Sequence, residues 1–107
     1  MTYADLIIAI RSLGLPCDFE SFDSPPPIPY TVVAYSHNVD MIADNVNYLD
    51  VANYQLEYYN EIKHPPTEKL IENKLREFRL PFRKIGFWIK EENLYQIIYE
   101  IQLVGGY

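Results

Sequence analysis

The first dozen residues carry apolar side chains at helical spacing. Thr2 is a suitable N-cap, and Asp5 stands three residues later, where a carboxylate favours the start of a helix. Gly14 follows the last apolar position and is typical of a helix end. The apolar positions are Leu6, Ile7, Ile10 and Leu13. This pattern predicts a helix over residues 2–13 with one apolar face.

The next segments favour strands. Residues 17–22 alternate and predict a short strand, and the Pro25–Pro27 run that follows cannot join a sheet ladder. Residues 29–36 are β-branched and aromatic and predict a second strand, central in the sheet. Residues 51–59 alternate strictly, which predicts a third strand with one buried side. Its buried side would consist of Ala52, Tyr54, Leu56 and Tyr58.

Residues 37–50 lie between these strands and show no period, because asparagine and aspartate residues interrupt the apolar ones. Such a segment is either a long loop or an extended β-arm. A loop of this length in a small domain usually has a function.

A second helix is predicted to begin at Pro65-Pro66, since proline is tolerated in a first turn. The spacing predicts an apolar stripe with Glu68 and Glu72 outside it, and Pro81 marks the end. The predicted stripe is Leu70, Ile71, Leu75 and Phe78.

The remaining residues predict a hairpin. Residues 82–90 and 94–103 read as two strands joined by a short turn over 91–93, with a loose tail after them. Alternate residues of the last strand, from Tyr95 to Leu103, would face the helices. The expected fold is a single α+β domain over residues 1–107. It would have a mostly antiparallel sheet of about five strands, with two helices packed on one face.

Composition narrows the possible functions. The chain of 107 residues has a formal charge of −6 and nine lysines and arginines, which argues against binding to nucleic acid phosphates. Such charge is compatible with a surface that DNA slides past. Cys17 is the one cysteine, so no intrachain disulfide can form and a reducing compartment is expected. Neither a secretion signal nor a membrane span is expected.

Candidate chemistry is sparse. His37, Asp40 and Asp44 could share a metal ion only if their segment were helical. Asp50 with Glu61 and Lys63 has the residue types of a metal nuclease. Eleven residues of strand would, however, hold the two carboxylates about 35 Å apart. With no nucleophile motif or phosphate loop either, we predict no catalytic residues, no cofactor and a non-enzymatic protein.

Two surface features suggest interactions. Four of the ten tyrosines would lie on the buried faces of the strands. The candidates for exposure are Tyr3, Tyr35, Tyr48 and Tyr59. Exposed tyrosines are typical of protein interfaces. The basic residues between Lys69 and Lys84 would form either a solvated face or a contact for an acidic neighbouring subunit.

Several phrases of the sequence resemble the small tail-terminator or tail-completion proteins of siphophages that infect Gram-positive bacteria. The order and spacing of these phrases match over nearly the whole chain. They are Leu13-Gly14-Leu15-Pro16, Pro27-Ile28-Pro29-Tyr30-Thr31-Val32-Val33, Ala43-Asp44-Asn45-Val46 with Tyr48, Asn53-Tyr54-Gln55-Leu56-Glu57-Tyr58-Tyr59, the proline-led helix, and the closing segment from Glu91 to Glu100.

The resemblance implies a structural protein of virion assembly that forms a ring, typically hexameric, on the head-proximal end of the tail tube. Its partners would be copies of itself, the major tail tube protein and a head-closure or connector protein. DNA would pass through the lumen without specific binding, and no membrane would be involved. The protein would be made in the host cytoplasm and end in the virion tail.

Residues 37–50 would then be an arm that reaches a neighbouring subunit or the tube. The candidate interface residues are His37, Asn38, Asp40, Met41, Ile42, Asp44 and Tyr48. Two alternatives stay open at the level of sequence. One is a head-closure or connector protein on the other side of the joint. The other is a small acidic cytoplasmic binding module, such as a host-takeover protein or an antitoxin-like inhibitor.

Overall fold

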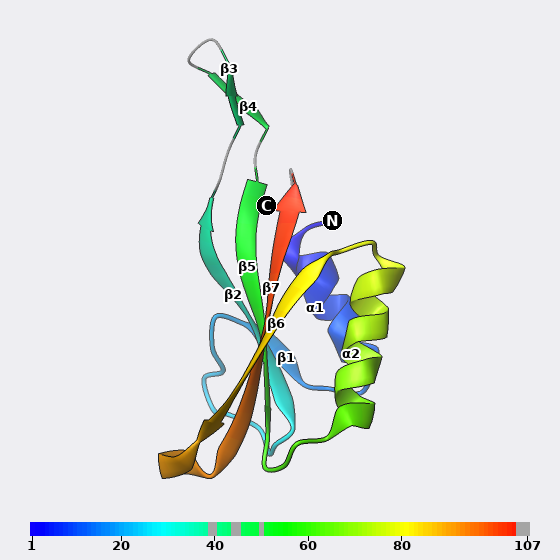
Figure 1. The fold of residues 1–107 in the computed structure, drawn as a ribbon, viewed down its shortest axis with the longest axis vertical. Coiled ribbons are helices and arrows are strands. Elements are labelled where there is room, and N and C mark those ends of the chain that lie inside the picture. Colours follow the sequence, from blue (N-terminus) through cyan, green and yellow to red (C-terminus); the bar gives the residue numbers. More distant parts are fainter. Residues whose placement is uncertain (39–40, 44–45, 50, 105–107) are drawn as a thin grey trace.

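The computed structural model describes residues 1–38, 41–43, 46–49 and 51–104. The elements are α1 (Tyr3–Arg11), β1 (Cys17–Phe19), β2 (Tyr30–Asn38), β3 (Met41–Ala43), β4 (Val46–Leu49), β5 (Val51–Asn60), α2 (Pro65–Glu77), β6 (Phe82–Ile89), the 3₁₀ turn η1 (Lys90–Glu92) and β7 (Leu94–Val104). Within these residues, five strands form a sheet in the order β1-β2-β5-β7-β6, and β3 pairs with β4 separately. Both helices lie on the same side of the large sheet (Figure 1), so the predicted α+β class is confirmed.

Helix α1 begins at a capping box. The Thr2 hydroxyl accepts a hydrogen bond from the Asp5 backbone N–H at 3.2 Å, and the Asp5 carboxylate accepts one from the Thr2 N–H at 3.0 Å. This reciprocal pair satisfies two backbone donors at the helix start. Leu6 and Ile10 are fully buried, and Gly14, with φ of +87°, ends the turn that follows. The predicted helix is confirmed with a slightly earlier end.

Strand β5 lies in the middle of the sheet, between β2 and β7. Leu56 pairs with Val33 of β2 on one side and with Tyr99 of β7 on the other. All four alternate residues predicted for its buried face are buried, including Tyr54 and Tyr58. Because β7 supplies a matching buried row, the core lies between these two strands and the helices.

Strand β1 is shorter than the strand predicted over residues 17–22, and it differs from the other strands of the sheet in direction. It is three residues long and runs parallel to β2, whereas every other pair in the sheet is antiparallel. The strand stops because Glu20, with φ of +65°, leaves the extended conformation. The short parallel strand follows from the proline-containing connection, which carries the chain back to the start of β2.

The apolar stripe predicted for α2 is wrong at two positions. Leu70 and Phe78 are 50% and 42% exposed, while Glu68 is 2% exposed. The buried positions of the helix are Glu68, Ile71 and Leu75. A carboxylate occupies the first of them because two lysines, described below, reach it there.

Strands β6 and β7 form the predicted hairpin. The turn contains η1 and Asn93, whose φ of +52° suits the short side chain of asparagine. The alternate residues of β7 face the helices as predicted. Val104 belongs to β7 rather than to the expected tail, and residues 105–107 lie outside the described residues.

Candidate interaction surfaces

The segment 37–50 contains a β-arm. Strand β2 continues to Asn38, and β3 pairs with β4 in antiparallel register, with Met41 opposite Leu49 and Ala43 opposite Val46. Figure 1 shows this pair beyond the end of the main sheet, as an extension of β2 and β5. Of the two predicted forms, loop and extended arm, the arm is the observed one.

The predicted interface residues are distributed along this arm. His37 is exposed near its base, with Nδ1 2.9 Å from the Ser36 hydroxyl. Asn38, Met41, Ile42 and Tyr48 have their backbones in β2, β3 and β4. The remaining two predicted residues, Asp40 and Asp44, lie outside the described residues.

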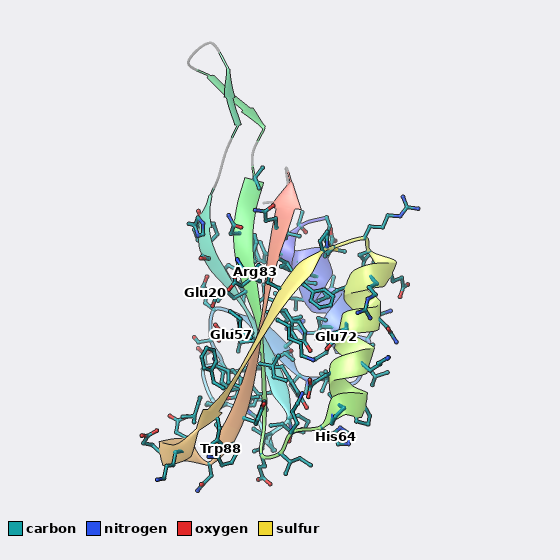
Figure 2. All side chains as sticks on the ribbon, in the orientation of Figure 1. Glu20, Glu57, His64, Glu72, Arg83 and Trp88 are labelled. Carbon is teal, nitrogen blue, oxygen red and sulfur yellow. The ribbon has the colours of Figure 1, made fainter. Side chains whose placement is uncertain are left out.

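The face of the main sheet opposite the helices carries several hydrogen-bonded polar side chains. The Gln96 amide donates a hydrogen bond to the Tyr59 hydroxyl at 2.9 Å, and that hydroxyl donates to Glu57 at 2.8 Å. Burial and the bond to Glu57 raise the pKa of Tyr59. Further along, the Gln102 amide donates to Asn53 at 3.1 Å. Figure 2 labels Glu57 and Arg83 on the strands of this sheet. Cross-strand hydrogen bonds such as those of Gln96 and Gln102 help to stabilise a sheet.

The tyrosines predicted to be exposed have mixed environments. Tyr35 is 45% exposed, as predicted. Tyr3 and Tyr59 are half-buried, because Tyr3 stacks on Phe19 with ring centroids 4.2 Å apart and Tyr59 stacks on Tyr30 at 5.0 Å. The side chain of Tyr48 lies outside the described residues. Tyr3 and Tyr59 are therefore less exposed than Tyr35, because aromatic neighbours distant in sequence partly cover them.

Strand β6 is the most exposed element of the sheet. It pairs with β7 on one side and forms the sheet's edge on the other. Three large apolar residues on it are exposed: Ile85 by 37%, Phe87 by 47% and Trp88 by 51%. Gly86 stands among them, where a Cβ would lie 3.3 Å from the Tyr95 hydroxyl. An unpaired edge with exposed apolar side chains is a ready site for adding another strand.

A network of charges joins α2 to β6. The Lys84 ammonium lies 2.7 Å from Glu68 and 2.7 Å from Glu72, and Lys63 also pairs with Glu68. The Tyr99 hydroxyl donates to Glu72 at 3.0 Å. Figure 2 shows Glu72 between α2 and the sheet. Lys84, which belongs to the predicted basic run, therefore forms its ion pairs within the chain.

The network changes the pKa of its members. Burial acts to raise the pKa of Glu68 and Glu72. Lys63 and Lys84 outweigh it at Glu68, and Lys84, the Tyr99 hydroxyl and Arg76 outweigh it at Glu72, so both pKa values lie below the ordinary value. Burial acts to lower the pKa of Lys84, and the two carboxylates outweigh it in the other direction. Burial and the bond to Glu72 raise the pKa of Tyr99.

These directions predict how stability depends on pH. Because Glu68 and Glu72 have lower pKa values folded than unfolded, their contribution is complete above the ordinary value of 4.5 and is lost as pH falls through the folded values. We expect the Gln variants at both positions to lose less free energy of unfolding than wild type as the pH falls below that value. Urea unfolding between neutral and acid pH checks this. An equal loss of unfolding free energy in variant and wild type between neutral and acid pH would contradict it.

The candidate metal and nuclease residues of the sequence are described only in part. Among the described residues, no three His, Cys, Asp or Glu side chains gather in a way that could hold a metal ion. Of the candidate nuclease set, Lys63 pairs with Glu68 and Asp50 lies outside the described part of the chain. No helix within the described ranges is long and apolar enough to cross a membrane.

The comparisons with known proteins find likeness in structure rather than in sequence. No protein-family model matches the chain, and no curated protein matches it either. Among solved structures, a chain of the "Virion of native gene transfer agent (GTA) particle" superimposes with a TM-score of 0.65. The alignment covers 91% of this chain and 83% of the other at 11% sequence identity. At that identity, the likeness shows that the two chains share a fold, and this fold occurs in a virion particle.

Proposed function

We propose that this chain is a structural, non-enzymatic protein of a tailed-phage virion, which caps the tail tube as a tail terminator and forms part of the head-tail joint. The observation that carries the proposal is the likeness to a chain of a gene transfer agent virion, which extends over 91% of this chain. The order of sequence phrases that resembles tail-completion proteins supports the finer assignment.

The shape and charge of the molecule agree with a ring subunit. The longest extent is 50 Å, with the β-arm at one end and the turn of the β6–β7 hairpin at the other (Figure 1). Projections at opposite ends suit contacts with successive neighbours in a closed ring, in which each subunit uses two different surfaces. A net charge of −6 would keep DNA from adhering to the lumen as it passes.

Deletion of the gene from its parent phage tests the proposal. We expect negative-stain electron microscopy of the lysate to show filled heads separate from tails of uneven or excessive length, because tube growth would have no stop. A copy of the gene supplied from a plasmid should restore normal virions, which controls for effects on neighbouring genes.

Other phenotypes would redirect the assignment. Tails of normal length beside leaking or empty heads would place the protein in head closure, on the other side of the joint. Intact virions in normal number would remove it from virion assembly and favour the acidic binding module.

A further inference from the structure

The two edges of the main sheet differ in their hydrogen bonding. At β1, three outward groups are satisfied within the chain: the Cys17 carbonyl accepts from the Arg11 guanidinium at 2.8 Å, the Phe19 N–H donates to the Asp18 carboxylate at 2.8 Å, and the Phe19 carbonyl accepts from the Ser21 N–H at 2.7 Å. This edge is closed to another strand. Strand β6 pairs on one side with β7 over eight residues, so about half of its backbone groups point outward.

The β-arm, made of β3 and β4, is a separate two-stranded sheet. Strands β3 and β4 have three and four residues and, among the described strands, pair with each other. An isolated two-stranded hairpin is at best marginally stable in water, and a third strand or an apolar cover is what stabilises one. By sequence, most of the residues of β3 and β4 are apolar.

The charges of the two segments are complementary. Residues 37–50 contain three aspartates and no lysine or arginine. Residues 82–90 contain Arg83, Lys84 and Lys90 and no acidic residue. Lys84 is engaged with α2, which leaves Arg83 exposed on β6, and Lys90 is exposed in η1, directly after the strand. Cations on an edge strand discourage pairing with a like strand and favour an acidic one.

The arm cannot reach the apolar part of β6 in its own chain. The arm begins where Val51 pairs with Val104, whereas Phe87 pairs with Gln96. Eight residues of β7 separate these levels, which is roughly 26 Å at the rise of a strand. Strand β4, the longer strand of the arm, is roughly 13 Å long by the same measure, and the arm points away from the hairpin turn (Figure 1).

We infer that the β-arm of one copy docks on the β6 edge of a second copy, with the apolar residues of β3 and β4 covering Ile85, Phe87 and Trp88. The contact joins two different surfaces, so its repetition gives a ring or a filament rather than a two-fold dimer. The inference rests on the proposed assembly of several copies and names the surfaces that make the contact.

Disulfide trapping tests the contact. One tagged population carries Ile42→Cys in the arm, and a second population with a different tag carries Phe87→Cys in β6. Cys17 is 2% exposed and burial raises the pKa of its thiol, so the native cysteine should not compete. We expect a mixed disulfide between the two tags after mild oxidation, both in concentrated purified protein and in particles from a deletion phage complemented with the variants.

Two controls define the result. Lys69→Cys, on the exposed side of α2, replaces Phe87→Cys as the matched control and should give far less cross-linked product. Adding Ile85→Lys to the Phe87→Cys chain should abolish cross-linking while thermal unfolding stays unchanged, because Ile85 is exposed and a further cation repels strand addition.

Failure of this inference is distinct from failure of the proposed function. Cross-linking no greater than in the Lys69→Cys control, in solution and in particles alike, would overturn the docking, even for a protein whose gene deletion gives overlong tails. Like-to-like disulfides, arm to arm or β6 to β6, would also overturn it, since they report a two-fold contact.

Discussion

Replacement of Lys84 by alanine is expected to lower the free energy of unfolding by about 2 kcal/mol at neutral pH. The buried Glu68 carboxylate would lose one of its two lysines, and Glu72 would lose its nearest cation at 2.7 Å. The effect stays below that of a fully buried pair because the Lys84 side chain is 36% exposed and Lys63 remains. Urea unfolding followed by far-UV circular dichroism measures it.

A matched variant separates this network from general surface charge. Lys69→Ala removes an exposed lysine from α2 and should change stability by less than about 0.5 kcal/mol. Combining Lys84→Met with Glu68→Leu should recover much of the loss, because apolar residues of similar volume often replace a buried ion pair without cost. Equal unfolding of Lys84→Ala and Lys69→Ala would show that the network adds nothing to stability.

Adjacent residues of α2 should respond very differently to the same substitution. Ile71 is fully buried, whereas Leu70 is 50% exposed. We expect Ile71→Ala to cost about 3 kcal/mol, through lost burial and the cavity it leaves. Leu70→Ala should cost less than about 0.5 kcal/mol, since alanine is the stronger helix former. Urea unfolding of the pair, under one set of conditions, measures the difference.

The pair also tests the orientation of the helix. In a helix turned as the sequence pattern alone predicts, both residues belong to the apolar stripe, and both substitutions would cost several kcal/mol. A large loss for Leu70→Ala would therefore contradict the packing of α2 described above.

Residues whose environment is set by their own segment were predictable. Ala52, Tyr54, Leu56 and Tyr58 alternate along β5, and their burial follows from the period of a strand. Likewise, Thr2 and Asp5 form the capping box that their spacing indicates. The overall α+β class follows from such local patterns taken in order.

Residues whose environment depends on distant partners were not predictable. Glu68 is buried because Lys63, from the preceding loop, and Lys84, from β6, converge on it, and no local period reveals this. Tyr59 is covered by Tyr30 across the sheet. For residues 37–50 the sequence does not decide between a loop and strands, because asparagines and aspartates interrupt the period by which a strand is recognised.

The position of Trp88 has a practical consequence. It is the one tryptophan of the chain, it lies on β6 with half of its surface exposed, and its ring centroid is 6.4 Å from that of Tyr95. Its fluorescence in the free protein therefore reports a solvent-facing indole rather than the packed core. Emission should shift to shorter wavelength when a partner covers β6. The molecule thus carries an intrinsic optical reporter of that edge, and assembly can be followed in real time without a label.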